Sequence, residues 1–506
     1  MPAACFDFGF FRKDRFCGSS GFVRDHLFAL PKKEVKMEEK IITQSLRPAV
    51  SQPSQAEVFD LVSELVENKE YRRLKAIGEA MEAPDVADIL GEFDKREQAV
   101  LFRLLSKEQA AEVFVELDSD TQEHLIHSFT DTELSEVLSE LYIDDLVDVV
   151  EEMPAVVVKR ILRSSDPADR AAINQILKYP KNSAGSVMTT EYVRFIEGVN
   201  VEAALLHIRR VAIDKETIYT CYVTDKDRHL TGVVTARELL IADPQTPLTD
   251  FMERNVLYAH TNDNREEVAL TLNKYGLLAL PVVDSEQRLV GIITLDDALD
   301  VLKEESEADF AKMAAITPTE KPYLKTSVIS LFLSRVPWLL LLMLSSTISG
   351  AILSGFEAAL PAVLVLFVPM IMGTGGNSGG QSSVTVTRSI SLAEVAFSDI
   401  HKVFFKELRV GILCGTVLGA VTFGKVMLID GLLLGYSDVS LTVALAVSLS
   451  LAMTIIVSKM IGAILPLLAK KVGLDPAVMA SPLITTLVDA VSLVVYFIVA
   501  KSVIGI

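Results

Sequence analysis

The chain has 506 residues, half of them hydrophobic, and carries a formal net charge of −19 at pH 7. Its mean hydropathy is nevertheless positive, at +0.36. Acidity and apolarity must therefore occupy different parts of the chain: the sequence is polar and acidic up to about residue 309 and strongly apolar from residue 328 onward. This length and pattern exclude a single-domain protein, and we expect a soluble half, a membrane half and no nucleic-acid partner.

Short amphipathic motifs recur in the N-terminal third. We expect residues 1–56 to be a disordered extension and residues 57–180 to form an acidic helical domain. VADILGEF, AAEVFVEL and LSEVLSEL begin at residues 86, 110 and 134, a spacing that indicates stacked helix pairs. A solvated helical adaptor is one interpretation. The other is a functional carboxylate face, because Asp144, Asp148 and Glu151 or Glu152 recur at helical spacing with no basic residue between 143 and 158.

A second repeat occupies the next segment, which we delimit as residues 181–302. VTDKDRHLTGVVTARELL, from Val223, aligns without gaps to VVDSEQRLVGIITLDDAL, from Val282, and each copy predicts strand, acidic turn, strand and helix. The phrases GSVMT, LPVVD and GIITLDD resemble those of a tandem CBS domain pair. The resemblance implies regulation and a candidate adenine nucleotide, such as ATP, held by Thr235 with Glu238 and by Thr294 with Asp297. Glu238 departs from the usual Asp.

The junction between the two halves is densely acidic. Residues 295–310 read LDDALDVLKEESEADF, with seven carboxylates against one lysine. A solvated helix face is the simpler interpretation of such a run. The alternative is a sensor, because repulsion between these carboxylates and those near Asp144 would be relieved by a divalent cation. We assign residues 303–327 to a connecting helix and linker.

Residues 328–506 are expected to form a membrane domain of five transmembrane helices. The apolar stretches run from 336 to 354, 358 to 387, 410 to 434, 441 to 468 and 480 to 504. Lysines and arginines gather before the first stretch, between the second and third, and between the fourth and fifth. These basic flanks predict a cytosolic N-terminal half and a C-terminus on the outer side. We expect a multi-pass protein of a bacterial inner membrane.

The second apolar stretch contains FVPMIMGTGGNSGGQSSVTVT, with five glycines between Gly373 and Gly380. This composition predicts an interrupted helix whose backbone carbonyls line water. Close helix packing through small residues is the alternative.

Asp489 lies about 13 Å into the last stretch, too deep for a short side chain to reach the surface. Ser481, Thr485 and Asp489 are spaced four apart and share one helix face. A cation site, a proton relay and a structural hydrogen bond are all compatible with such an acid. Oxygen ligands suit a hard divalent ion, Mg²⁺ in particular, and a twofold dimer would place two Asp489 side chains around one axis. No P-loop or nucleophile elbow is present, so we expect no enzyme.

The order of these parts, with GTGGNSGGQS at 373–382 and LDPAVMASPLITTLVDAV at 474–491, resembles the MgtE family of magnesium channels. The resemblance implies a homodimer with its pore at the subunit interface, Mg²⁺ uptake, and closure by cytosolic Mg²⁺. The central ion site then falls on Asp489, with Gly373, Gly376 and Asn377 nearby. The implied regulatory acids are Glu266, Asp297, Asp300, Glu305 and Asp309, with Asp144 and Asp148 in the N domain. Two further sensor positions are lost, at Gly276 and Ala308.

Two other functions remain open at this point. One is a proton-coupled secondary transporter of divalent cations, in which Asp489 is the protonation site and the glycine-rich segment is a moving half-helix. The other is a membrane-anchored nucleotide sensor that transports nothing.

Overall fold

The computed structural model describes residues 55–319, 323–324, 326–357, 361–392, 394–436, 438–478 and 481–505. All but the last two residues of the predicted disordered extension, 1–56, lie outside these ranges. The chain divides into two compact units, residues 1–299 and 300–506, and each is described by itself.

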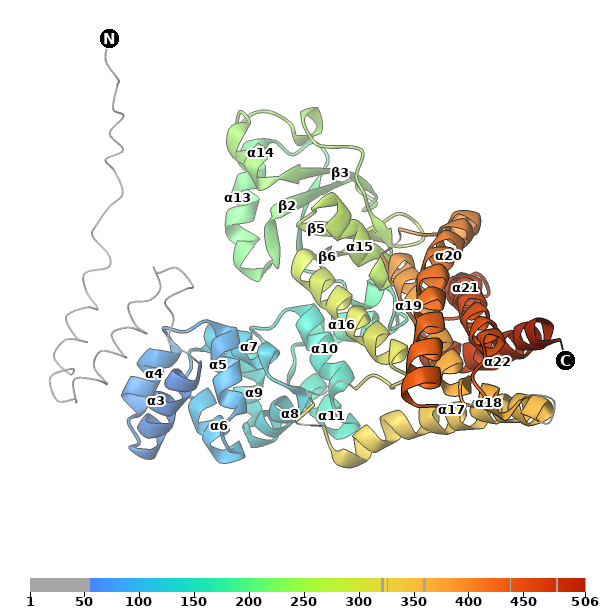
Figure 1. Cartoon of the computed structure of the whole chain (residues 1–506). Coiled ribbons are helices and arrows are strands. Elements are labelled where there is room, and N and C mark those ends of the chain that lie inside the picture. The colour runs from blue at the N-terminus through green and yellow to red at the C-terminus, as the bar shows by residue number, and fades with distance from the viewer. Residues whose placement is uncertain are drawn as a thin grey trace, which may run out of the picture. The chain divides into compact units, whose positions relative to one another are not determined.

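The first unit begins with a series of short helices. They are α3 (Gln55–Glu67), α4 (Tyr71–Gly78), α5 (Ala83–Gly91), α6 (Lys95–Phe102), α7 (Lys107–Glu116), α8 (Ser119–Ser128), α9 (Asp131–Leu138), α10 (Ile143–Glu152), α11 (Ala155–Ser164) and α12 (Pro167–Ile176) (Figure 1). The three repeated motifs lie on α5, α7 and α9, which pack in that order, while α6 packs on α8. The predicted stack of helix pairs is confirmed.

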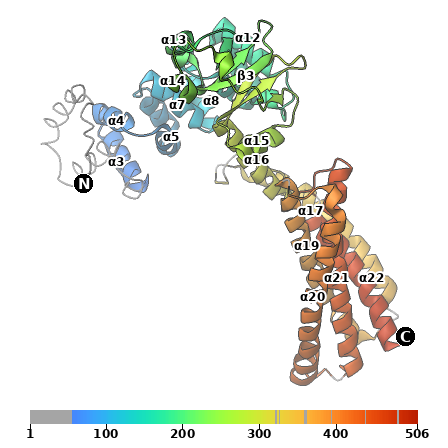
Figure 2. The same cartoon turned by 90° about the horizontal axis from the view of Figure 1, so that it is seen from above.

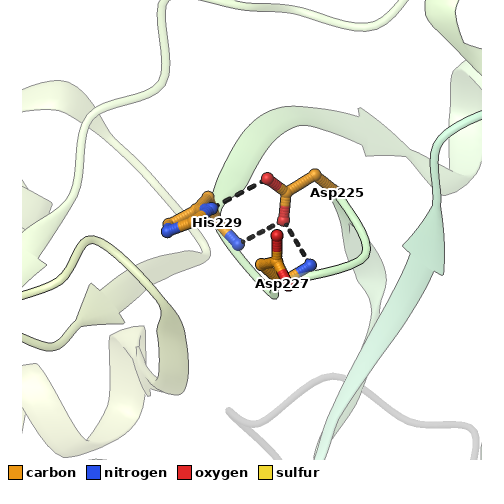
Figure 3. Close-up of side chains that lie close together, drawn as sticks. All are labelled: Asp225, Asp227 and His229. Atoms are coloured by element: carbon orange, nitrogen blue, oxygen red, sulfur yellow. Dashed lines mark hydrogen bonds and ion pairs between the residues drawn. The ribbon is translucent and has the colours of Figure 1, made fainter.

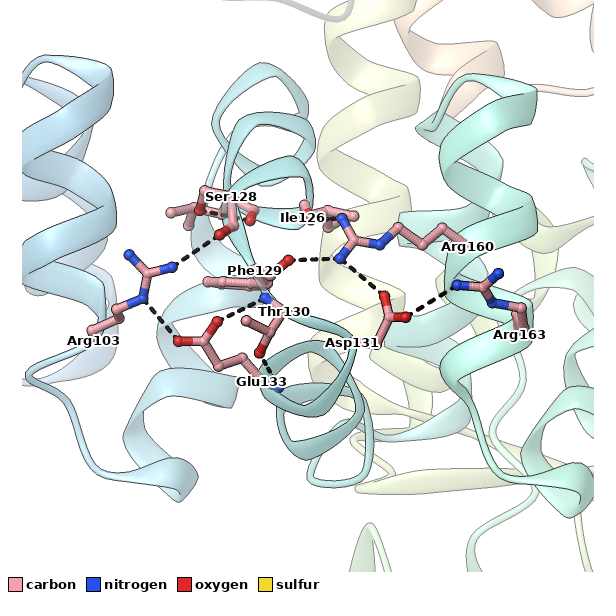
Figure 4. Close-up of polar contacts among 10 residues, drawn as sticks. Arg103, Ile126, Ser128, Phe129, Thr130, Asp131, Glu133, Arg160 and Arg163 are labelled. Carbon is pink, nitrogen blue, oxygen red and sulfur yellow. Dashed lines mark hydrogen bonds and ion pairs between the residues drawn. The ribbon is translucent and has the colours of Figure 1, made fainter.

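Side chains at the turns fix where these helices begin. Asp94 and Thr130 form capping boxes with Glu97 and Glu133, which satisfies backbone N–H groups that would otherwise lack partners. Arginines then join turns that are distant in sequence (Figure 4): Arg103 donates to Glu133 Oε1 at 2.9 Å and to the Ser128 carbonyl. On the other side of the same turn, Arg160 donates to the carbonyls of 126 and 129 and to the carboxylate of 131. These contacts stabilise the stack between its apolar layers.

The CBS pair consists of two small sheets with the same topology. The first contains β1 (Tyr192–Ile196), β2 (Thr217–Thr224) and β3 (Leu230–Thr235), and the second contains β4 (Ala259–His260), β5 (Ala279–Val283) and β6 (Leu289–Thr294). In each, the first two strands are parallel and the last two antiparallel. Helices α13 (Val201–Val211), α14 (Ala236–Ile241) and α15 (Arg265–Tyr275) accompany them, and the predicted internal repeat is confirmed.

Helix α16 (Leu295–Met313) follows β6 and carries the acidic run. The second unit contains the long helices α17 (Val328–Glu357), α19 (Val368–Ser391), α20 (Ile400–Lys425), α21 (Leu441–Lys471) and α22 (Ser481–Ile504), with the short α18 (Ala362–Val365) before α19. Within the described ranges, five stretches are long and apolar enough to cross a membrane, as predicted. Helices α19, α20, α21 and α22 run alongside one another (Figure 2), and both α20 and α22 pack on α21. Their common core includes Phe367, Leu451 and Tyr496.

The predicted interruption of the glycine-rich segment is wrong. Helix α19 is continuous through it, and its glycines serve close packing instead. A Cβ on Gly375 would collide with Ser492 and Thr454, and a Cβ on Gly462 of α21 would collide with the backbone of Gly379. Tight approach of neighbouring helices is what small residues allow in membrane proteins.

The third span also differs from its predicted limits. It begins at Phe397 rather than at 410 and runs through a π-helix, η8 (Val426–Leu433). Asp430 is 4% exposed within this π-helix, and both of its carboxylate oxygens accept from Lys425 Nζ, at 2.9 and 2.7 Å. Lys425 is therefore paired with a carboxylate of the same span.

Candidate functional sites

A polar stripe runs along α19 in the membrane unit. Gly373, Asn377 and Gln381 are spaced four residues apart, share one helix face and are exposed on the isolated chain. Buried polar groups are costly within a bilayer, so an exposed amide pair in a membrane helix requires either water or protein against it. This stripe defines one wall of a candidate ion site.

Asp489 and Thr485 of α22 adjoin that wall. Both lie against Gly376: a Cβ there would stand 2.8 Å from Thr485 Cγ2 and 3.1 Å from Asp489 Oδ1. Glycine at 376 thus leaves the carboxylate room beside α19. Asp489 Oδ1 is buried and has no hydrogen-bond partner among the described residues, which leaves it able to bind a water, a proton or a cation. The structure therefore brings the predicted residues Asp489, Thr485, Gly376 and their neighbours on α19 together.

Ser481, predicted on the same face of α22, has a side chain outside the described part of the structure. Further polar residues that were not predicted from the sequence lie deep in the same unit, among them Lys459 of α21, which is 5% exposed. A lysine nine residues before the end of the fourth apolar stretch was the signal that could have found it.

A second candidate site is an acid cluster in the first unit. Asp144 and Asp145 open α10, Asp297 lies in the first turn of α16, and Glu216 precedes β2. Asp144 is 9% exposed, and its Oδ1 lacks a hydrogen-bond partner in the described ranges. Helix α10 is anchored nearby, because the backbone N–H of Ile143 donates to Glu191 Oε2 at 3.0 Å. Segments far apart in the chain therefore place four carboxylates close together.

Burial and mutual repulsion make these acids hard to ionise. Burial, reinforced by Asp297, Asp145 and Glu216, raises the pKa of Asp144 well above its usual range. Burial and the Asp297 carboxylate raise the pKa of Asp145 to about 7, and the same two causes raise that of Glu216 to about 8. Such a site favours a bound cation or protons, since either removes the repulsion.

The sequence identified Asp144 and Asp297 of this cluster but missed Asp145 and Glu216. Asp145 was not predicted because it does not share the i, i+4 spacing of Asp144 and Asp148. Glu216 was not predicted because it lies in a connecting segment that contains no recognised motif. Asp148 is exposed on α10, and Glu266 is half-buried in the first turn of α15.

The remaining predicted sensor residues lie on the part of α16 that belongs to the second unit. Asp300 is exposed, and Glu305 is half-buried. Asp309 accepts a hydrogen bond from Ser391 at 2.8 Å, and burial raises its pKa against the opposing effect of this bond. The end of α16 is further tied down by Lys312, whose Nζ lies 2.8 Å from an oxygen of Asp475 and 4.0 Å from one of Asp309.

The predicted nucleotide-binding pairs of the CBS domains are hydrogen-bonded to each other. Glu238 Oε2 accepts from Thr235 Oγ1 at 2.8 Å and from the backbone N–H of Thr235 at 2.7 Å. Thr294 Oγ1 likewise donates to Asp297 Oδ2 at 2.5 Å. In the first copy the bonds form a capping box at the start of α14, so part of this pattern is explained by helix capping.

Asp225, Asp227 and His229 form a compact group in the turn between β2 and β3 (Figure 3). Their candidate ligand atoms lie within 4.8 Å of one another. However, Asp225 Oδ1 accepts from the backbone N–H groups of 227 and 229, and Oδ2 contacts His229 Nδ1 at 2.8 Å. In the second repeat, Asp284 Oδ1 likewise accepts from the backbone N–H groups of 286 and 288, and Arg288 stands where the first repeat has His229. These aspartates shape the turns, and we assign no metal to them.

Comparison with known proteins agrees with this arrangement. Residues 368–499 match a family model described as a divalent cation transporter, residues 81–182 match the MgtE intracellular N domain, and residues 248–304 match the CBS domain. Five membrane helices, a polar site beside an intramembrane acid and an intracellular helical domain define a multi-pass membrane transporter of divalent cations.

The magnesium transporter MgtE of Thermus thermophilus is 36% identical over 446 residues, which cover 87% of this chain and 97% of the relative. That of Bacillus subtilis is 32% identical over 445 residues, covering 87% and 95%. The chain belongs to the MgtE family of magnesium transporters and is not an enzyme. Among solved structures, the cytosolic domain of the Mg²⁺ channel MgtE in complex with ATP is 38% identical, covers 48% of this chain and 98% of that one, and has a TM-score of 0.46.

Proposed function

We propose that the chain is a homodimeric channel that admits Mg²⁺ into the cell along α19 and α22, with Asp489 as its central ion site. The exposed polar stripe at Gly373, Asn377 and Gln381 carries this proposal. In a bilayer these groups need a polar neighbour, and a second copy facing them across a twofold axis would enclose a water-lined path. Two Asp489 carboxylates would then balance one divalent charge.

The residues at the site suit a hydrated ion. Mg²⁺ prefers oxygen ligands and gives up its water slowly, so it is best held through water by hydroxyls, amides and a few carboxylates. Thr485, Asn377 and Asp489 offer that set of groups. The described residues around Asp489 include no thiolate or imidazole that would favour zinc or copper.

We further propose that cytosolic Mg²⁺ closes the channel. The acid cluster of Asp144, Asp145, Glu216 and Asp297 is the support for this step, because a divalent ion would stabilise its compact form by cancelling the repulsion. The ion can shift the equilibrium only by its differential affinity for the two forms. Asp148, Glu266, Asp300, Glu305 and Asp309 are proposed as further contributors.

The transport proposal is tested by Mg²⁺ uptake in a magnesium-starved host. Asp489→Asn should abolish uptake while leaving the protein in the membrane, because the path loses its deep negative charge. Asp438→Asn, an exposed aspartate between η8 and α21, is the matched control and should transport normally. Normal uptake by Asp489→Asn would refute the site.

The same assay separates a channel from the proton-coupled alternative, which the unpartnered Oδ1 of Asp489 also permits. A channel follows the Mg²⁺ gradient, and its flux is insensitive to a pH step across the membrane. A transporter that uses Asp489 as its protonation site requires the proton gradient. Uptake that stops when the proton gradient is collapsed, at constant membrane potential, would favour the transporter.

Gating is tested in excised patches while Mg²⁺ is raised on the cytosolic face. Joint replacement of Asp297, Asp300 and Asp309 by Asn should leave a channel open at concentrations that close the parent. Closure over the parent's range would show that the acidic helix is only solvated.

Three finer assignments are also proposals. From the basic flanks, we place the protein in a bacterial inner membrane with the N-terminal half in the cytosol and the C-terminus outside. From the paired Thr and acid positions, we propose that the CBS pair binds an adenine nucleotide such as ATP. The domain limits at 56, 180, 302 and 327 are working boundaries for truncation.

A further inference from the structure

A buried lysine in the membrane unit is linked to a glutamate through a serine of the glycine-rich helix. Lys459 of α21 is 5% exposed and Ser382 of α19 is 2% exposed. Lys459 Nζ donates to Ser382 Oγ at 3.4 Å, and Ser382 Oγ donates to Glu407 Oε2 of α20 at 2.7 Å. The three residues therefore connect three adjacent helices with a continuous chain of hydrogen bonds.

The depth of Lys459 makes charge compensation necessary. It lies twelve residues before the end of α21, which corresponds to about 18 Å along the helix axis. A lysine at a helix end can extend its ammonium group to the surface, but this one is enclosed by protein. An uncompensated charge in such a position is strongly unfavourable, whereas a nearby opposite charge joined by a hydroxyl offsets the cost. Glu407 is that charge.

The network reaches the helix that carries the polar stripe. Ser382 follows Gln381 directly, so it points away from the stripe while sharing its backbone. Gly379, one turn earlier, is the point at which α19 touches Gly462 of α21. The hydrogen bonds thus fix the rotation of α19 about its own axis and its position along that axis relative to α20 and α21.

We propose that Lys459, Ser382 and Glu407 are positioning residues for cation passage: they fix α19 beside the ion path and cancel the lysine's charge next to it. This inference rests on the proposed function, in which α19 lines that path.

The direction in which conductance changes distinguishes an effect of charge from an effect of packing. If Glu407 is neutralised, the ammonium group of Lys459 remains uncompensated in a medium of low dielectric constant and repels a divalent cation. If Lys459 is neutralised, the carboxylate of Glu407 remains and attracts the cation. A merely structural role would instead make both replacements change conductance in the same direction.

The test uses the full-length protein with Glu407→Gln, Lys459→Met, the double variant and Lys459→Arg. Unitary Mg²⁺ conductance in excised patches should fall by roughly half or more in Glu407→Gln and stay equal or rise in Lys459→Met. Lys459→Arg keeps the charge and a donor, so it should conduct like the parent. Shifts of the same sign in the two single variants would overturn the proposal.

The amount of protein in the membrane provides the second measurement. Breaking a buried charge pair is costly, so each single neutralisation should lower the folded protein in the membrane by about tenfold, and the double variant should recover it to within about threefold of the parent. If a single variant gives no measurable current, the amount of folded double variant in the membrane is the deciding measurement. The proposal is refuted if the double variant is no more abundant than the single variants.

Asp489→Asn is run in parallel. If that variant conducts like the parent, the ion-path assignment has failed, and recovery in the double variant then supports charge compensation without a role in permeation.

Discussion

Replacing Glu216 with Gln should strengthen the contact of α10 with the CBS pair when Mg²⁺ is absent. Burial is the largest cause that raises the pKa of this carboxyl from its ordinary 4.5 to about 8, and repulsion from Asp297 and Asp145 adds to it. A folded-state pKa above the unfolded one contributes stability below about pH 4.5 that is progressively lost as the pH rises toward 8. At pH 7 the carboxyl therefore opposes the compact arrangement, and an amide removes that opposition.

The magnitude follows from the same values. Each tenfold change in proton affinity is worth about 1.4 kcal/mol, so the interval from 4.5 to pH 7 gives an upper limit of roughly 3 kcal/mol. Glu216 is only partly buried, and solvent screening reduces this figure to about 1–2 kcal/mol. The gain corresponds to an increase in protection of about tenfold or somewhat more.

Hydrogen exchange of the full-length protein in detergent measures this gain. The backbone N–H of Ile143 is a suitable probe because it donates to Glu191 at the start of α10. In the parent, protection there should increase when Mg²⁺ is added, and it should increase when the pH is lowered from 8 to 5 after correction for the intrinsic exchange rate. In Glu216→Gln, both increases should be smaller, because protection without Mg²⁺ is already higher.

Glu197→Gln is the matched control, since Glu197 is an exposed acid of the same CBS domain. It should respond to Mg²⁺ and pH like the parent. Equal responses of Glu216→Gln and Glu197→Gln would refute the interpretation of the cluster as mutually repelling acids.

Gly462→Ala should destabilise the membrane unit by more than about 2 kcal/mol, because its Cβ would meet the backbone of Gly379, whereas Gly424→Ala faces open space and serves as the control. Thermal unfolding followed by size-exclusion chromatography measures the difference, and equal midpoints would contradict the packing. Glu133→Gln should cost about 1 kcal/mol or less at pH 7, because the exposed ion pair with Arg103 lowers the pKa of Glu133 to about 2. That contribution exists above pH 4.5 and disappears as the pH falls toward 2, so a loss of equal size at pH 2.5 would argue against it.

Much of the architecture could be predicted from local patterns. Repeated motifs at 86, 110 and 134 identified the stacked helices, since their apolar faces recur with the helical period. Two aligned copies of strand, turn, strand and helix identified the CBS pair, and long apolar stretches identified the membrane helices. Asp489 could be selected because a carboxylate deep in such a stretch is exceptional. Each of these features depends on residues that are neighbours in the chain.

Other features depend on packing, and only the tertiary structure decided them. Glycines at 373–380 are compatible with a broken or an intact helix, and the helix is intact because Gly375 and Gly379 fit against side chains of α21 and α22. The acid cluster combines Asp144 with Glu216 and Asp297, which lie up to 153 residues apart. Burial and mutual repulsion change the proton affinity of these groups only after folding has brought them together. The sequence by itself thus determined the elements and the isolated intramembrane acid, while contacts between distant segments decided which charged groups act on one another.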